Sequence, residues 1–144
     1  MKILLLTDGS THSLDAARWL AAHATQLRDA PDTHLLHVHP PMPYPGAAAI
    51  AGRAAVEDYQ RGACEEALAG SAAVLQGANV RFHMSWIVGE VAPTITQYVR
   101  TGKFDLVVMG THGHGALANI ALGSIATKCI ASLGVPIVVV PRPH

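Results

Sequence analysis

The chain has 144 residues, of which 50% are apolar and 14% are charged, so it can fill a hydrophobic core and lacks the composition of a disordered protein. Ten basic residues balance ten acidic ones, which argues against a nucleic-acid-binding protein with a broad basic face and against electrostatic attachment to a membrane. No segment reaches the ~20 apolar residues of a membrane span, and the length predicts a single domain over residues 1–144.

The start of the chain and its two cysteines bear on localisation. The apolar run at 3–6 ends at Asp8, too early for a signal peptide. Cys64 and Cys129 lie far apart and in no ligand-like spacing, which favours a thiol-reducing compartment. We therefore expect a cytoplasmic protein in which both cysteines are small packing residues of Ala-rich helices.

Short apolar runs alternate along the chain with longer Ala-rich stretches. The runs predict five strands, at residues 3–6, 34–39, 80–88, 104–109 and 136–140. The first, fourth and fifth runs are nearly continuous in Leu, Ile and Val, as in parallel strands that are covered on both faces. The alternation predicts an α/β domain with an open parallel sheet and right-handed crossovers.

The stretches between the strands predict four helices, at about 11–27, 48–75, 90–100 and 124–133. Ser10 or Thr11 can cap the first helix, and Pro93 falls in the first turn of the third, where its missing N–H costs nothing. Gly134 and Pro136 indicate the end of the fourth. The proline-rich segment 40–46 predicts a stiff, exposed loop rather than a helix.

Candidate ligand contacts follow the strands, because open parallel sheets bind ligands beyond the carboxyl ends of their strands. Gly110 and Gly113 follow the fourth strand and allow a ligand to approach the backbone. Gly123 and Ser124 open the last helix, where free N–H groups and a hydroxyl favour an anion. The alternative is that the glycines only permit a sharp turn and a helix start. Walker-A, dinucleotide and nucleophile-elbow motifs are absent from the sequence.

The spacing Gly110-x2-Gly113-x9-Gly123-Ser124 resembles the nucleotide-binding signature of the universal stress protein family. The resemblance extends over nearly the whole chain, through segments 3–10, 35–38, 89–92, 105–113 and 135–140. It implies an open five-stranded parallel sheet in the order 3-2-1-4-5 with helices on both faces, as in Rossmann-like folds. It also implies the ATP-binding branch of the family, with ATP and Mg²⁺ as ligands.

The resemblance further implies a role for each matching position. Thr7 and Asp8 are expected near the adenosine, and the Val38 backbone at the adenine. The ribose and phosphate contacts that it implies are Met109, Gly110, Gly113, Gly123, Ser124 and Ile125. For Asp8 the alternative is a carboxylate that only caps the first helix. Many relatives carry a basic residue where this chain has His112, so phosphate binding here would depend on main-chain N–H groups, Ser124, a metal ion and a protonated His112 or His114.

Histidines are numerous, and four of them are expected at the same crevice. His37 and His39 alternate on the second strand, and His112 and His114 lie in the glycine loop. A site for zinc, copper or nickel is conceivable there, although a packed strand histidine and solvated loop residues are the more common outcome.

The last strand, residues 136–140, is a wholly apolar sheet edge in the implied order, and such an edge invites pairing. The resemblance implies a homodimer through this strand; a loop of the same chain covering the edge is the alternative.

We interpret the protein as an ATP-binding stress sensor or regulator with at most slow ATP hydrolysis, because no set of groups for rapid phosphoryl transfer is readable. The other candidates are a nucleotide-independent dimeric interaction module and a His-lined metal-dependent enzyme. The sequence alone does not decide between ATP and AMP.

Overall fold

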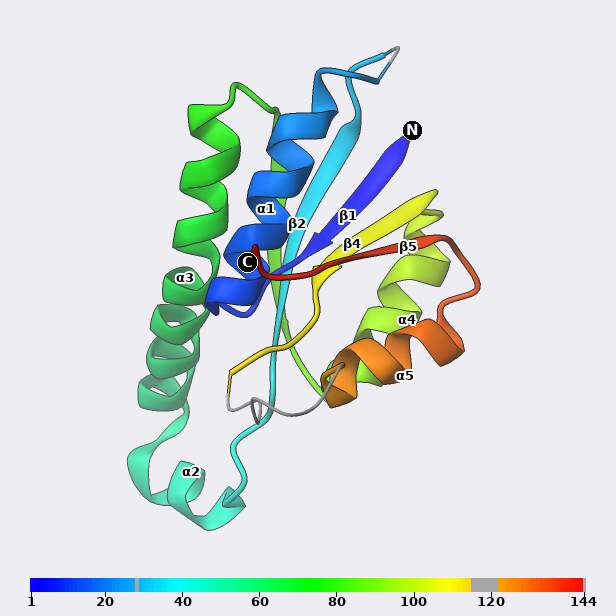
Figure 1. Cartoon of the computed structure of the whole chain (residues 1–144). Helices are drawn as coiled ribbons and strands as arrows, with labels where there is room; N and C mark the ends of the chain where they lie inside the picture. The colour runs from blue at the N-terminus through cyan, green and yellow to red at the C-terminus, as the bar shows by residue number, and fades with distance from the viewer. Residues whose placement is uncertain (28, 115–121, 144) are drawn as a thin grey trace.

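A computed structural model describes residues 1–27, 29–114 and 122–143 of the chain (Figure 1). The strands are β1 (Lys2–Leu6), β2 (Asp32–His39), β3 (Phe82–Val88), β4 (Leu106–Gly110) and β5 (Ile137–Val140). The helices are α1 (Thr11–Ala24), α2 (Pro45–Ala51), α3 (Arg53–Gly77), α4 (Val91–Gly102) and α5 (Ser124–Ser132).

The strands form one parallel sheet in the order β3-β2-β1-β4-β5, which confirms the expected order 3-2-1-4-5. The strand order therefore reverses between β1 and β4, which are neighbours in the sheet although α1, β2, α2, α3, β3 and α4 lie between them in sequence. Such a reversal leaves a crevice at the carboxyl ends of the two strands.

The helices cover both faces of the sheet (Figure 1). Side chains alternate between the faces along each strand, so Leu5 packs with α1 and α3, whereas Leu4 packs with α4 and α5. Both leucines have no exposed surface. The continuous Leu and Val runs of β1 and β4 are thus explained by burial on both sides.

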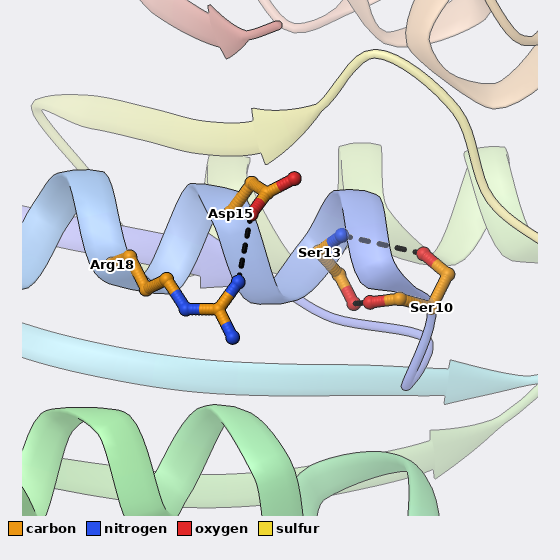
Figure 2. Close-up of polar contacts among 4 residues, drawn as sticks. All are labelled: Ser10, Ser13, Asp15 and Arg18. Carbon is orange, nitrogen blue, oxygen red and sulfur yellow. Dashed lines mark hydrogen bonds and ion pairs between the residues drawn. The ribbon is translucent and has the colours of Figure 1, made fainter. Parts of the chain in front are cut away.

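The turn after β1 is closed by a serine cap at the start of α1. Ser10 has extended backbone angles, and its hydroxyl accepts a hydrogen bond from the Ser13 N–H at 3.3 Å (Figure 2). The Ser13 hydroxyl donates back to the Ser10 carbonyl at 2.9 Å. Further along the helix, Arg18 pairs with Asp15 at 2.8 Å (Figure 2). The cap satisfies an otherwise unpaired amide and fixes where α1 begins, as expected for Ser10.

The expected single helix over 48–75 is wrong, because the structure has two helices there. Gly52 separates α2 from α3 with φ of +86°, a conformation that favours glycine and interrupts the helical path. The expectation of a loop over 40–46 is wrong at its end, since Pro45 begins α2 and Gly46 follows within it. Proline is well tolerated at the first helical position, where its N–H would have no partner.

The remaining elements agree with the expected ones to within a few residues. Pro93 lies in the first turn of α4, and α5 ends at Ser132, shortly before Gly134 with φ of +66°. Across the described part of the chain, no helix is long and apolar enough to cross a membrane.

Candidate functional site

A cavity of about 680 Å³ lies at the carboxyl ends of β1, β2 and β4, a volume typical of small-molecule sites. Its floor is apolar, with contributions from Leu6, Leu36 and Ile95. Its rim is formed by the turn after β1, the end of β2, the segment after β4 and the start of α5. The cavity therefore offers an apolar interior and a polar rim of main-chain groups.

All nine residues singled out from the sequence line this cavity. They are Thr7, Asp8, Val38, Met109, Gly110, Gly113, Gly123, Ser124 and Ile125. The strand order accounts for their convergence, since β1 lies between β2 and β4 and the three strands end on the same side. Their proximity to one another is thus a structural fact, whereas the ligand atoms that each would contact remain predictions.

Asp8 connects the turn after β1 to the segment after β4. One carboxylate oxygen accepts a hydrogen bond from the Ser10 N–H and the other from the His114 N–H, both at 3.0 Å. Burial raises the pKa of this carboxyl, but hydrogen bonds from Ser10, His114 and Ser13 outweigh it, so the pKa lies below its usual value. Asp8 is therefore an anion at neutral pH and braces the rim of the cavity, besides being available to a ligand or metal ion.

Close contacts at the end of β4 and just after it leave no room for a side chain at two glycine positions. A Cβ atom on Gly113 would clash with the carboxylate of Asp8, and a Cβ on Gly110 would lie 2.5 Å from the His12 carbonyl oxygen. Gly123 has slightly more room, since its Cβ would lie 3.3 Å from the Thr111 carbonyl oxygen and from His112 Cα. The Gly123 N–H already donates to the Thr111 carbonyl at 2.8 Å, which joins the two sides of the cavity rim.

The start of α5 presents main-chain N–H groups to the cavity. Ser124 is its first residue, and Ser124, Ile125 and Ala126 all line the cavity. The preceding Gly123 has no side chain that could cap these amides. Free amides at a helix start carry partial positive charge, so this edge is suited to an anion.

The Thr7 side chain forms hydrogen bonds within the protein. Its buried hydroxyl lies 3.1 Å from the Ser13 hydroxyl and 2.9 Å from the Ser71 hydroxyl, and within 3.3 Å of the Ala67 carbonyl. These bonds join β1 to α1 and α3 beneath the cavity. Thr7 thus supports the cavity wall, whatever it contributes to a ligand.

The cavity contains little formal charge apart from Asp8. Among the described residues that line it there is no Lys or Arg, as the sequence analysis expected for the glycine loop. The four histidines that were expected at one crevice do converge, since His37, His39, His112 and His114 all line the cavity. Burial, followed by the proximity of His37, lowers the pKa of His39.

The sequence analysis missed one member of the site region. Cys64 of α3 was assigned to packing alone, yet the structure places its sulfur within 4.8 Å of ligand atoms of both His37 and His39. The Cys64 side chain has no exposed surface. Its neighbours in space could not be read from sequence because they depend on which face of α3 meets β2.

The fold and the cavity at the switch point of its sheet define a doubly wound α/β protein with a ligand-sized site at the carboxyl ends of its strands. The sequence model of the universal stress protein family matches residues 1–141, and the chain belongs to that family. A universal stress protein from Thermus aquaticus is 34% identical over 140 residues, which cover 96% of both chains. Universal stress protein MJ0531 from Methanocaldococcus jannaschii is 31% identical over 142 residues, covering 99% of this chain and 82% of its own.

Solved structures share the fold. The protein MJ0577, 25% identical, superposes with a TM-score of 0.77 over 99% of this chain and 96% of its own. A universal stress protein family member from Arabidopsis thaliana, solved with AMP bound, has a TM-score of 0.70 at 14% identity, covering 100% and 93%. One from Archaeoglobus fulgidus in complex with dAMP has a TM-score of 0.69 at 17% identity, covering 97% of each chain.

Proposed function

We propose that this chain is an ATP-binding universal stress protein that acts as a nucleotide-dependent sensor or regulator. The observation that carries the proposal is the combination, in one cavity, of an apolar floor with a rim of main-chain N–H groups from the segment after β4 and the start of α5. An adenine ring suits the apolar part, and a polyphosphate suits the amides. Relatives solved with AMP and dAMP bound support an adenine nucleotide as the ligand class.

The nine cavity residues take the roles implied by the family resemblance in this proposal. Thr7, Asp8 and the Val38 backbone face the adenosine, and Met109 and Gly110 border the ribose. The phosphates lie against Gly113, Gly123, Ser124 and Ile125. Hydrogen bonds to a charged group contribute roughly 1.5–3 kcal/mol each, so three or four amides can replace a cationic side chain.

Asp8 favours a metal ion as part of the proposed complex. A carboxylate at the rim repels a polyphosphate unless a cation lies between them. Mg²⁺ binds oxygen ligands and commonly bridges a carboxylate to phosphate groups. We therefore expect Mg·ATP to bind more tightly than free ATP.

Equilibrium dialysis or calorimetry with ATP in the presence and absence of Mg²⁺ tests the proposal. We expect saturable binding with a dissociation constant below about 1 mM, equivalent to more than roughly 4 kcal/mol of binding free energy. AMP and CTP serve as comparison ligands for the phosphate and base contacts. Absence of binding at that concentration favours the alternative of a nucleotide-independent interaction module.

We also propose a cytoplasmic homodimer paired through β5. This strand is an edge of the sheet, and Ile137, Val138 and Val139 are only partly buried within the chain. Val138→Lys is expected to shift the protein from dimer to monomer in sedimentation velocity. Met84→Lys, on the opposite edge strand β3, is the matched control, since Met84 is 55% exposed. If Met84→Lys dissociates the dimer and Val138→Lys does not, the interface lies at β3 and the proposal of pairing through β5 is wrong.

A further inference from the structure

Two histidines of β2 and one cysteine of α3 face each other beside the nucleotide cavity. His37 and His39 lie on the face of the sheet that α3 covers, and Cys64 belongs to α3. One ligand atom from each side chain lies within 4.8 Å of the other two. The two imidazole rings have centroids 5.8 Å apart at an interplanar angle of 56°. This cluster, His37-His39-Cys64, joins three typical metal ligands from two elements that are far apart in sequence.

The hydrogen bond of His37 leaves one ring nitrogen available. Nδ1 lies 2.9 Å from the main-chain carbonyl oxygen of Thr7, and a carbonyl oxygen can only accept. In the neutral ring, Nδ1 therefore carries the hydrogen and Nε2 has the lone pair. Histidines that bind metal ions usually donate their second N–H to a carbonyl or carboxylate in this way, which fixes the tautomer and the ring orientation.

The charge state of the cluster is compatible with a cation. His37 is 6% exposed and Cys64 is fully buried, and the partly buried His39 has its pKa lowered. Burial, together with the neighbouring Glu65 carboxylate, raises the pKa of the Cys64 thiol. Without a metal ion the Cys64 thiol keeps its proton, which the ion would replace.

We propose that His37, His39 and Cys64 bind one Zn²⁺ ion, with the fourth position open toward the cavity. Two imidazoles and one thiolate suit zinc, and three protein ligands with one open position are the usual arrangement of zinc sites that contact a substrate or water. Tetrahedral coordination at normal bond lengths separates the ligand atoms by about 3.3–3.6 Å. The side chains therefore need to converge by about one ångström from their present positions. The Cys64 proton leaves to solvent as the Zn–S bond forms.

The open position gives the site a connection to the nucleotide cavity. His37 and His39 both line that cavity, as do Ala63 and Ala67 on either side of Cys64 in α3. A water molecule or an oxygen or nitrogen atom of a bound ligand can therefore reach the fourth position from the cavity. The zinc site itself does not depend on nucleotide binding and is tested without nucleotide.

A second group of metal-ligand side chains provides an internal comparison. Asp32, His34 and His83 gather at the opposite end of β2 and β3, with His34 Nε2 3.2 Å and His83 Nε2 3.8 Å from an Asp32 carboxylate oxygen. The side chains of Asp32 and His83 are 51% and 75% exposed. This group lacks sulfur and is open to solvent, so it is a competitor for weak binding of added metal ions.

The experiment uses the full chain without an affinity tag, titrated with Co²⁺ as a spectroscopic substitute for Zn²⁺. The wild type is expected to bind one equivalent with a thiolate-to-cobalt charge-transfer band, and one equivalent of Zn²⁺ is expected to remove that band. Cys64→Ser is expected to abolish the band, and His39→Gln to weaken binding at least tenfold. Circular dichroism of each variant verifies that it is folded.

Two control variants distinguish this site from other sources of binding. Cys129→Ser removes the other cysteine, which is buried in α5 on the opposite face of the sheet, and is expected to leave the band unchanged. His83→Gln disrupts the solvent-exposed group and is also expected to leave it unchanged. The proposal is overturned if the wild type gives no thiolate band with Co²⁺, or if metal binding persists in Cys64→Ser and disappears in His83→Gln.

Discussion

The two ends of the sheet have hollows of similar volume and a histidine-containing cluster each, but they differ in side-chain charge and in the direction of the helices around them. The cavity at the carboxyl ends has a volume of about 680 Å³, and a hollow of about 790 Å³ lies at the amino ends of β2 and β3. A histidine-containing cluster adjoins each of them. Arg81 lies in the amino-end hollow, whereas the described lining of the carboxyl-end cavity has no Lys or Arg.

From side-chain charge alone, an anion would be expected at the amino-end hollow. The direction of the helices favours the carboxyl-end cavity instead. α5 begins at the carboxyl ends of the strands without a side-chain cap, and Ser124, Ile125 and Ala126 at its start line that cavity. α3 ends near the amino-end hollow, where the Ala78 N–H donates back to the Val74 carbonyl at 3.2 Å. The comparison indicates that in a parallel α/β sheet the backbone direction favours an anion at the carboxyl ends, even where an arginine, Arg81, lies at the other end.

The largest expected effect comes from filling the closest backbone contact at the carboxyl end. Gly110→Val places its Cβ 2.5 Å from the His12 carbonyl oxygen, so β4 and α1 must separate. We expect a loss of about 3 kcal/mol in the free energy of unfolding, measured by urea denaturation. Gly77→Val, near the amino-end hollow and with no atom near its Cβ, is the control and is expected to lose less than about 1 kcal/mol. Equal losses in both variants would contradict the assignment of tight packing to the carboxyl end.

Thr7→Val tests the polar contacts beneath the cavity. The change keeps the shape of the side chain but leaves the Ser71 hydroxyl, which has no exposed surface, without its Thr7 partner. We expect a loss of about 2 kcal/mol in the free energy of unfolding, because an unsatisfied buried hydroxyl costs about 1–3 kcal/mol. Thr7→Ser keeps the hydroxyl and is expected to recover part of the loss. If Thr7→Val is as stable as the wild type, these contacts do not stabilise the wall of the cavity.

Gly123→Val tests whether the start of α5 binds the ligand. Its Cβ would lie 3.3 Å from main-chain atoms of Thr111 and His112, so these need to shift by a few tenths of an ångström, and its methyl groups occupy the edge where the phosphates are expected. We expect at least a tenfold loss of ATP affinity by calorimetry, about 1.4 kcal/mol, with a small change in Tm. Gly77→Val is again the control and should bind ATP like the wild type. Unchanged affinity in Gly123→Val would mean that this glycine has only a structural role.

Asp8→Asn gives the smallest effect and depends on pH. The folded-state pKa of Asp8 lies below its usual value, so its ionised form stabilises the fold above about pH 4 and this contribution is lost as pH falls through the folded pKa. We expect Asp8→Asn to be about 1 kcal/mol less stable than the wild type at neutral pH, a value reduced by its partial exposure. The difference should shrink toward about pH 3 in urea denaturation. If the stability difference between the wild type and Asp8→Asn grows as the pH falls, the ionised form of Asp8 does not stabilise the fold.

The sheet was predictable because its signal is local. Runs of Leu, Ile and Val in β1, β4 and β5 indicate strands that are covered on both faces, and the structure confirms all five strands. The break between α2 and α3 was missed because the surrounding Ala-rich sequence has high helix propensity throughout. Only the positive φ of Gly52 interrupts it, and a glycine within an Ala-rich segment does not reveal its backbone angles.

The candidate site was predictable where its residues follow strands. The positions after β1, β2 and β4 meet at the carboxyl end in any sheet of this order, whereas Val38, Met109 and Ile125 were expected only from the family resemblance. The contact between Asp8 and the segment after β4, and the position of Cys64 near His37 and His39, were not predictable. Both depend on the rotation and depth of packed elements, which have no pattern in sequence.

A titration of ¹⁵N-labelled protein with Mg·ATP, followed by amide chemical shifts, tests the central claim most directly. The account predicts saturable shifts of the amides of Gly113, His114, Ser124 and Ile125 at the carboxyl end. It predicts no comparable shifts for Gly77, Arg81 and His83 around the amino-end hollow. Shifts confined to the amino end, or none at saturating nucleotide, would contradict phosphate binding by the main chain after β4 and at the start of α5.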